Sequence, residues 1–389
     1  MSALPARADV AVVGGGVMGT SIAFHLARRG ADVVLLERGA VCSGPTRHST
    51  AIIRLHYSQP LLVRLAAYGL RAYLAFADEV GADAGFRRTG MVFAVPEAEG
   101  ELLAANVELG RREGANTRVL AAEEARELEP RLDMTGLSSC FEPDAGYCDP
   151  YAVAAGYAAA AERRGAAITP GIVVERVRED GVDTRAGRVE AGAVVVAAGP
   201  WSPALLAPLG YALPVTAAPA EVGRYRLPAS FGPPPPAVAI FAGEQFYLRP
   251  AEPGFVEVGS LAPEHTQSPV DPDRPVEGAR DETLARYARA LSARLPTAAG
   301  GHWRGAWTGI YDVTPDWEPV LGTVPGRDRV VAAAGFSGHG FKLAPAVGVA
   351  VAELVLDGAA TTFDVDPLAP DRFERGALIG ARYGYSVLG

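Results

Sequence analysis

The sequence predicts an α/β protein in which a parallel-sheet domain is interleaved along the chain with a smaller α+β domain built on an antiparallel sheet. Three observations carry this prediction. Residues 9–37 show the pattern of a strand, a glycine turn, a helix and a second strand. Residues 193–198 and 330–334 are short apolar runs, which are typical of buried strands. Residues 214–309 are rich in proline and strand-forming residues.

The first of these elements is a βαβ unit at the N-terminus. Residues 9–13 are apolar, residues 14–16 are glycines, and residues 17–29 place apolar side chains at helical spacing. Gly30 ends the helix, and residues 32–36 form a second buried strand that stops at Glu37. This order is typical of the start of a Rossmann-like sheet.

The later elements follow from the same patterns. Residues 330–334 precede a helical pattern over residues 343–356, so this pair would extend the parallel sheet. Residues 61–80 and 101–128 predict helices with one charged face, which cover the sheet or belong to the second domain. The aromatic runs between residues 241 and 258 predict strands of a separate antiparallel sheet.

Length and composition limit the function classes. A chain of 389 residues exceeds the size of one hydrophobic core, so two units with an interface are expected. Hydrophobic residues make up 49% and charged residues 21%, which predicts a folded protein. The net charge is −9 without a basic cluster, so we expect no nucleic-acid partner.

Three scattered cysteines predict neither a disulfide framework nor a metal site, and they are typical of intracellular thiols. The N-terminus passes directly into a strand without a signal sequence, and no run of eighteen apolar residues occurs. We therefore expect a cytoplasmic protein without a membrane span. The sequence leaves its oligomeric state open.

The glycine turn carries the first functional motif. Gly14, Gly16 and Gly19 form GxGxxG between a strand and a helix, the setting that binds a pyrophosphate at a helix N-terminus. Glu37, 23 positions after Gly14, supplies an acceptor for ribose hydroxyls and would repel a 2′-phosphate. The pattern predicts an adenine dinucleotide and leaves NAD and FAD as alternatives.

Seven ordered blocks decide between these cofactors. They are the GxGxxG motif and residues 49–57, 146–150, 197–202, 246–250, 311–316 and 335–342. With them the sequence resembles the D-amino-acid oxidase superfamily, closest to its branch of sarcosine oxidases and dimethylglycine dehydrogenases. The resemblance implies FAD as the cofactor and an amino acid or related amine as the substrate. It also implies an FAD-binding domain over residues 1–80, 145–214 and 310–375, a substrate domain over residues 81–144 and 215–309, and a C-terminal tail over residues 376–389.

The last block also has a physical rationale. Glycines at positions 335, 338 and 340 let backbone amides approach a ligand, and the following helix points its positive end at the same loop. Donors aimed at flavin N1 and O2 would stabilise the charge that develops when hydride reaches N5. By the resemblance, residues 338–341 line the flavin and Lys342, the chain's only lysine, reaches the substrate carboxylate.

Arg54 is the expected partner of Lys342. A guanidinium holds a carboxylate through two parallel hydrogen bonds, and an ammonium adds charge from the other side. The alternatives are a surface ion pair for Arg54 and a solvated Lys342. Tyr247 is expected as an aromatic wall across the flavin, with a core tyrosine as the alternative, and His56 and His339 are further polar candidates. The predicted catalytic residues are Arg54, Lys342, Tyr247 and His56.

The resemblance places Val174 and residues 197–201 at the adenine and ribose, and Ser43, Thr46 and Ser49 near the pyrophosphate or the isoalloxazine. The full set of expected cofactor-binding residues is Gly14, Gly16, Val17, Met18, Gly19, Glu37, Arg38, Ser43, Thr46, His48, Ser49, Thr50, Val174, Ala198, Gly199, Trp201, Gly309, Gly338, His339, Gly340, Phe341 and Lys342.

The sequence departs from these relatives at three points. Monomeric sarcosine oxidases tether FAD to a cysteine where this chain has Gly309, so we expect no such link. Dimethylglycine dehydrogenases use a histidine in a segment similar to residues 44–48, which makes His48 a candidate attachment point. The monomeric oxidases also use a second lysine to activate oxygen; here either Arg249 replaces it or electrons leave to an acceptor other than O2.

These features predict FAD-dependent oxidation of a C–N bond in an amino acid, or in a secondary or tertiary amine that carries a carboxylate. Hydride would pass to flavin N5 and the resulting imine would hydrolyse. Two alternatives stay open: oxidation of a hydroxy acid at the same site, and a subunit that holds FAD for electron relay within a larger complex.

Overall fold

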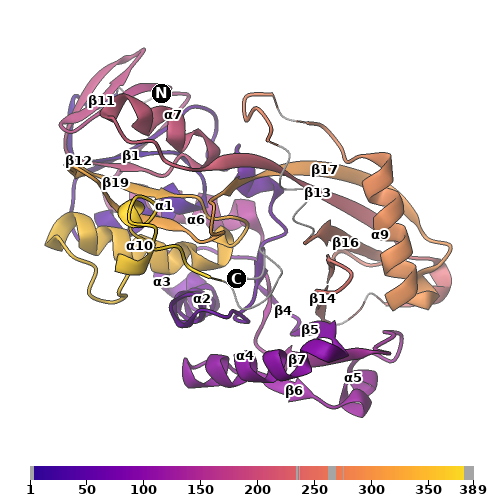
Figure 1. Cartoon of the computed structure of the whole chain (residues 1–389). Coiled ribbons are helices and arrows are strands. Elements are labelled where there is room, and N and C mark those ends of the chain that lie inside the picture. Colours follow the sequence, from indigo (N-terminus) through magenta and orange to yellow (C-terminus); the bar gives the residue numbers. More distant parts are fainter. Residues whose placement is uncertain (1–3, 234, 236, 262–268, 275, 381–389) are drawn as a thin grey trace.

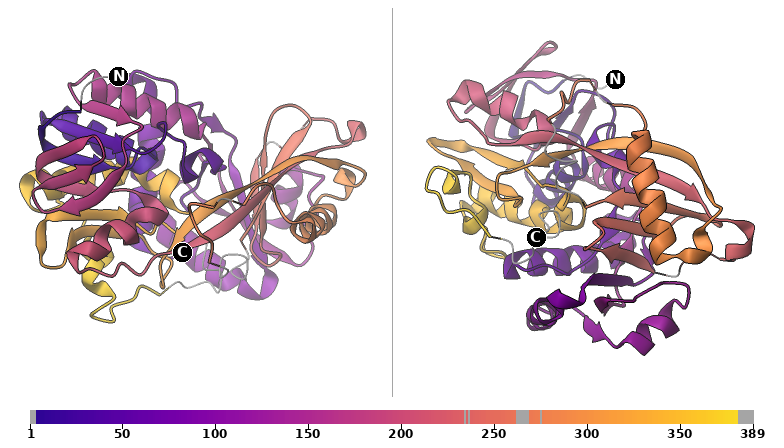
Figure 2. Two further views of the ribbon diagram at one scale, coloured as in Figure 1. Left: turned by 90° about the horizontal axis from the view of Figure 1, so that it is seen from above. Right: turned by 45° about the vertical axis from the view of Figure 1, so that its right-hand side comes forward.

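The computed structural model describes residues 4–233, 235, 237–261, 269–274 and 276–380. Figure 1 and the left view of Figure 2 show two lobes, one around each large sheet, with long strands passing between them. Residues 381–389 of the predicted C-terminal tail lie outside the described residues.

The first lobe is built on a parallel sheet. Its central strands run in the order β9, β2, β1, β12, β19, and every neighbouring pair is parallel. Their bounds are β1 Arg7–Val13, β2 Val33–Glu37, β9 Ala167–Pro170, β12 Gly187–Val196 and β19 Arg327–Ala334. Three antiparallel strands extend the edges, namely β10 Val174–Arg178, β11 Gly181–Thr184 and β18 Val320–Val324.

Both faces of this sheet are buried, which explains why its strands are almost continuously apolar. On one face Val10 and Val12 join a core with helices that pack on one another; on the other face Ala11 and Val13 join a second core with Leu206. The helices of the first core are α1 Val17–Arg28, α2 Pro60–Leu74, α3 Phe76–Val80, α6 Pro150–Glu162 and α10 Gly340–Asp357, and the short helix α7 Ser202–Leu206 lies on the second face. Figure 1 shows α1, α6 and α10 side by side.

The second lobe contains a sheet in the order β17, β13, β16, β15, β14, β5, β7, β6. Its pairs are antiparallel except that of β14 with β5. The strands are β5 Met91–Pro96, β6 Arg118–Leu120, β7 Leu137–Glu142, β13 Thr216–Arg226, β14 Val238–Phe241, β15 Phe246–Pro250, β16 Phe255–Ser260 and β17 His302–Val313. Helix α9 (Asp281–Arg294) buries Tyr287 and Leu291 against the sheet, and α4 (Gly100–Arg112) and α5 (Ala122–Leu128) lie near β5, β6 and β7 (Figure 1).

A small third sheet completes the architecture. It consists of β3 (Ile52–Ile53), β8 (Gly146–Tyr147) and β4 (Arg87–Arg88), with β8 in the middle. The predicted fold class, a Rossmann-like α/β domain with a second domain on a largely antiparallel sheet, is confirmed. Over the described residues, no helix combines the length and apolarity that a membrane crossing requires; the cytoplasmic location stays a prediction.

Candidate functional site

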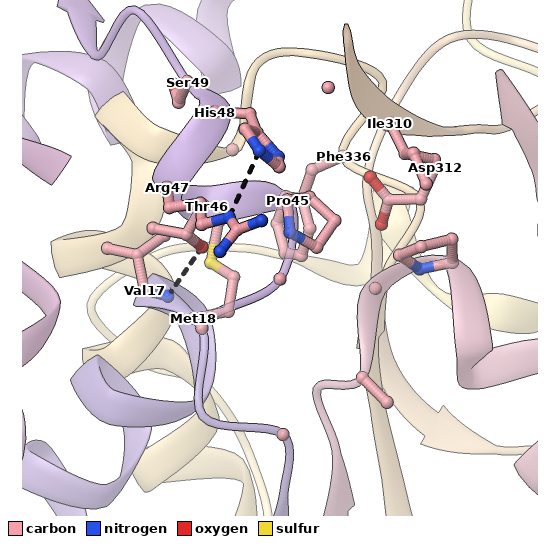
Figure 3. Close-up of a pocket in the computed structure, with 18 of the residues that line it drawn as sticks. Val17, Met18, Pro45, Thr46, Arg47, His48, Ser49, Ile310, Asp312 and Phe336 are labelled. Atoms are coloured by element: carbon pink, nitrogen blue, oxygen red, sulfur yellow. Dashed lines mark hydrogen bonds between the residues drawn. The ribbon is translucent and has the colours of Figure 1, made fainter. Parts of the chain in front are cut away.

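One cavity of about 870 Å³ runs from the carboxyl ends of the parallel strands to the second sheet. This is the edge of an open α/β sheet at which ligands bind, and the volume suits a large cofactor or ligand. The lining comes from the turn after β1, the end of β2, residues 43–50, the segment after β12, the β13 and β17 strands, and the first turn of α10. Figure 3 shows residues 45–49 on one side of this space, with Ile310 and Asp312 across from them.

The glycine turn after β1 brings the N-terminus of α1 to the cavity. Gly14 has a φ of 113°, and a Cβ there would lie 2.4 Å from the carbonyl oxygen of Ala197, so only glycine fits. The first turn of α1 contains no acidic residue, and the Val17 amide donates to Thr46 Oγ1 over 3.1 Å (Figure 3). The positive end of α1 therefore faces the cavity, as an anion site requires.

Glu37 is held rigidly at the end of β2. Its Oε2 accepts a hydrogen bond from the Gly15 amide and its Oε1 accepts one from the Gly39 amide, each over 2.6 Å. The carboxylate thus joins the glycine turn to the chain after β2 while it lines the cavity. Its place marks the end of the cavity where the ribose of a dinucleotide is expected.

The loop before α10 brings a second helix N-terminus to the cavity. Gly338 has a φ of 85°, and a Cβ there would lie 3.0 Å from the Tyr311 ring. The Gly335 amide donates to Asp312 Oδ2 over 2.7 Å, and the Ser337 amide donates to the Asp312 carbonyl over 3.0 Å. Burial raises the pKa of the Asp312 carboxyl to about 6. These bonds fix the loop against the end of β17.

The first turn of α10 depends on a proline and a tyrosine. Pro345 has no amide hydrogen, so it cannot bond the Phe341 carbonyl four residues earlier. The Tyr73 hydroxyl from α2 donates to that carbonyl instead, over 2.6 Å, and the Tyr73 and Phe341 rings stack at 5.6 Å. A Cβ at Gly69 would lie 2.0 Å from the Lys342 carbonyl oxygen, so α2 packs closely against this turn. The position of Lys342 is therefore set from two helices.

Two cations lie buried at the end of the cavity that adjoins α10. Arg54 is 4% exposed and Lys342 is 5% exposed, and both line the cavity. The Arg54 guanidinium donates to the His56 carbonyl and lies 4.3 Å above the Tyr57 ring, while Lys342 Nζ donates to the His339 carbonyl over 3.4 Å. Burial and, to a smaller extent, the charge of Arg54 lower the pKa of Lys342 well below its ordinary value. An anionic ligand would relieve this concentration of positive charge.

Another part of the cavity wall is aromatic and apolar. Tyr247 from β15 is buried, and the Thr50 hydroxyl donates to its hydroxyl over 3.3 Å. Burial raises the pKa values of Tyr247 and Tyr311, the latter to about 12, so both phenols are neutral at physiological pH. Ile52 and Ile240 continue the wall. The arrangement can hold a small anion with an apolar part.

The structure brings almost all predicted site residues to this cavity. Those that line it are Gly14, Gly16, Val17, Met18, Glu37, Arg38, Ser43, Thr46, His48, Ser49, Thr50, Arg54, Val174, Ala198, Gly199, Trp201, Tyr247, Gly309, Gly338, Gly340, Phe341 and Lys342. Their shared position in the cavity lining supports the predicted cofactor and substrate roles.

Three predicted residues do not line the cavity. A Cβ at Gly19 would lie 1.8 Å from the Gly14 carbonyl oxygen, so Gly19 serves the packing of α1 on the turn. The His56 ring packs on Phe93 at 4.2 Å with its Nδ1 3.6 Å from Cys140 Sγ, and burial lowers the pKa of His56 to about 3. His339 is also fully buried, with its ring 5.5 Å from that of Tyr57. The close contact of Gly19 agrees with the packing role of the third glycine in GxGxxG. The side chains of His56 and His339 do not line the cavity, and their contact with the ligand stays a prediction.

Several lining residues were not among the predicted ones. Tyr311 and Asp312 fall in a block that the resemblance already contained, and Gly15 lies within the glycine turn, so a sequence signal existed for all three. Asp273 also lines the cavity and has no such signal, because it stands in a proline-containing segment far from every motif.

His48, the candidate attachment point for FAD, and Arg249, the candidate replacement for an oxygen-activating lysine, differ in position. His48 lines the cavity; the Arg47 Nε donates to its Nε2 over 3.1 Å (Figure 3), and a Cβ at Gly309 would lie 3.2 Å from the His48 Cβ. Arg249 does not line the cavity, since it pairs with Glu257 at 2.6 Å and lies 4.3 Å above the Tyr147 ring. Arg249 is thus poorly placed to replace an oxygen-activating lysine.

Comparisons with known proteins agree with this geometry. A family model described as "DAO: FAD dependent oxidoreductase" matches residues 9–354. Glycine oxidase from Geobacillus kaustophilus is 32% identical, over 94% of this chain and 97% of its own length. The 4-methylaminobutanoate oxidase (formaldehyde-forming) of Paenarthrobacter nicotinovorans is 28% identical, over 95% of this chain and 46% of its own. The crystal structure of L-proline dehydrogenase from P. horikoshii superposes with a TM-score of 0.87 at 27% identity, covering 97% of this chain and all of that one.

Proposed function

The chain belongs to the DAO family of FAD-dependent oxidoreductases, as its sequence led us to expect, and on that premise we propose that it oxidises the C–N bond of a carboxylate-bearing amine. The substrate would be an amino acid or an N-substituted glycine-like amine. The observation that carries the proposal is the pair of buried cations, Arg54 and Lys342, at the end of the cavity that adjoins α10.

The described residues fit FAD along the whole cavity. The positive end of α1 suits the pyrophosphate, and Glu37 stands where the ribose hydroxyls of the adenosine half would lie. The loop at residues 335–339 and the positive end of α10, whose first turn also lacks acidic residues, suit the negative pole of the flavin ring. Bound there, FAD would accept a hydride at N5.

Arg54 and Lys342 would position the substrate. The guanidinium can hold a carboxylate through two parallel hydrogen bonds, and the Lys342 ammonium adds a third donor from α10. Holding the carboxylate fixes the α-carbon relative to the flavin, which converts a bimolecular encounter into an oriented one. Tyr247 and the apolar wall would cover the rest of the substrate and exclude water.

The substrate would react as the neutral amine, whose nitrogen lone pair drives hydride loss from the adjacent carbon, so the proposal requires no protein base. The imine that forms hydrolyses in water. Electrons would then leave to O2 or to another acceptor. The proposal includes the domain division expected from the sequence, with a substrate domain over residues 81–144 and 215–309, and a cytoplasmic location.

Anaerobic mixing tests this function. The holoprotein is combined with N-methyl amino acids, D-amino acids, proline and hydroxy acids in turn, while the absorbance of oxidised flavin is followed. We expect bleaching by at least one amine and none by the hydroxy acids. Bleaching by hydroxy acids alone would favour an enzyme that oxidises hydroxy acids. If no compound of the panel bleaches the flavin, a subunit that holds FAD for electron relay is favoured.

A further inference from the structure

Three side chains from distant parts of the chain meet at the rim of the cavity. The Arg38 guanidinium donates to Asp273 Oδ1 over 2.6 Å, and the Trp201 indole donates to the same oxygen over 2.9 Å. The Arg38 guanidinium also lies 3.9 Å above the Trp201 ring. All three residues line the cavity. They therefore form a closed triangle of contacts, which we call the rim cluster.

The rim cluster joins the two lobes. Arg38 directly follows β2, and Trp201 lies in a 3₁₀ turn (Gly199–Trp201) soon after β12, so both belong to the parallel-sheet lobe. Asp273 comes from the connection between β16 and α9 of the other lobe. Two hydrogen bonds, each of 2.9 Å, hold this connection near Asp273. The Val270 amide donates to the Ala217 carbonyl of β13, and the Asp273 amide donates to Asp271 Oδ1.

The position of the rim cluster identifies what it would cover. Arg38 is the neighbour of Glu37, whose carboxylate marks the ribose position, and Trp201 follows the strand beside β1. The cluster comes from other segments of the cavity lining than Arg54, which directly follows β3, and Lys342, which lies in the first turn of α10. An indole and a guanidinium plane are groups that stack on or beside an adenine ring.

We propose that Asp273 is a cofactor-retaining residue, which closes the rim cluster over the adenosine half of FAD and so slows its release. Without the carboxylate, Arg38 and Trp201 lose the acceptor that they share and each gains rotational freedom. The link that Asp273 makes between the two lobes would then be lost. Asp273 would take no part in the oxidation of substrate.

The size of the effect follows from exposure. The side chains of Arg38 and Asp273 are 47% and 61% exposed, so their attraction is weakened by solvent and by salt. Because one carboxylate oxygen serves two donors, we expect Asp273→Ala to raise the rate of FAD release about two- to tenfold, the range of a modest surface network. Added salt should accelerate release from the wild type more than from the variant.

The test follows flavin fluorescence after dilution of the holoprotein, which reports FAD release independently of any substrate. Asp180→Ala is the matched control, since Asp180 pairs with Arg188 at the same 2.6 Å, has a side chain 62% exposed and does not line the cavity. Arg38→Met should accelerate release as well. Adding Asp273→Ala to it should have a smaller effect than Asp273→Ala alone, because the Arg38–Asp273 interaction is already lost and only the Trp201–Asp273 hydrogen bond remains to be removed.

Equal release rates for wild type and Asp273→Ala would overturn the proposal, as would equal acceleration by Asp180→Ala. Fully additive effects of Arg38→Met and Asp273→Ala would also contradict it. The release assay is separate from the proposed function, because it needs no substrate and gives the same answer whichever amine the protein oxidises.

Discussion

The two ends of the cavity hold their cations in opposite ways. At the end that we propose for the adenosine of FAD (the adenosine end), Arg38 is half-exposed and paired with the carboxylate of Asp273. At the end that we propose for the substrate (the substrate end), Arg54 and Lys342 are almost wholly buried, and Lys342 donates to a backbone carbonyl. Charge at an exposed site is screened, whereas buried charge interacts strongly with any ion that enters. We therefore expect substitutions at the substrate end to change ligand binding and flavin reduction more than substitutions at the adenosine end change FAD release.

The largest effect is expected from Lys342→Met, which replaces the buried amine with an uncharged side chain of similar length. A hydrogen bond to a charged group contributes about 1.5–3 kcal/mol, so binding of a carboxylate inhibitor should weaken about ten- to hundredfold. Flavin reduction should slow as well. Spectral titration with benzoate and stopped-flow reduction measure the two quantities.

Arg188→Met, a surface substitution at an exposed ion pair, is the control for Lys342→Met and should change neither quantity. If Lys342→Met leaves both the inhibitor affinity and the reduction rate unchanged, the two ends of the cavity do not differ as described. The proposal that Arg54 and Lys342 hold the substrate carboxylate is then refuted.

The next effect concerns pH at the substrate end. Burial and Arg54 lower the pKa of Lys342 well below its ordinary value, so in the free protein the ammonium loses its proton at a lower pH than an exposed lysine does. A bound carboxylate favours the ammonium and raises that pKa, so binding takes up a proton. Affinity should therefore fall as pH rises, by up to about tenfold per pH unit for one proton, and then level off above the pKa of the complex.

Benzoate titrations across pH 6–10 would measure this dependence, with the Lys342→Met protein as the control that should lack the slope. A wild-type affinity that does not change with pH would show that Lys342 keeps its charge in the free protein. The rate of FAD release should not have a pH dependence that is lost in the Lys342→Met protein.

A smaller difference is expected in the choice of electron acceptor. The chain has one lysine, and Arg249 is neutralised by Glu257 outside the cavity. Over the part of the chain that the structure describes, neither a second lysine nor Arg249 therefore reaches the cavity to stabilise reduced oxygen. A quinone or dye should then reoxidise the reduced protein faster than air does. Stopped-flow reoxidation compares them. Rapid reaction with air would show that the cations already lining the cavity suffice for O2.

The smallest effect is expected at His48, between the two ends. Its Nε2 accepts a hydrogen bond from Arg47, so this nitrogen already has a partner. We expect FAD to be held without a covalent bond, and acid precipitation should leave all flavin in the supernatant for both the wild type and His48→Ala. Flavin that stays with the wild-type precipitate but not with that of His48→Ala would establish attachment at this residue.

The sequence could predict those parts of the fold and site that depend on neighbouring residues. The turn at residues 14–16 with its strand and helix, and the glycine loop before α10, are contiguous in the chain, so spacing alone indicates their structure. The bounds of the helices also depend on distant contacts. The helical pattern predicts a start at residue 343, whereas α10 starts at Gly340, and in its first turn the Tyr73 hydroxyl of α2 bonds the Phe341 carbonyl that Pro345 cannot bond.

By itself, then, the sequence determined the Rossmann-like unit, the FAD family and the pairing of Arg54 with Lys342 as a hypothesis. Only the tertiary structure decided which of these side chains reach the cavity. It turned His56 toward Cys140, buried His339 beside Tyr57, and brought Asp273 to Arg38. The physical reason is that the direction of a side chain and its distant contacts depend on how the two lobes pack, and local residue patterns do not encode that packing.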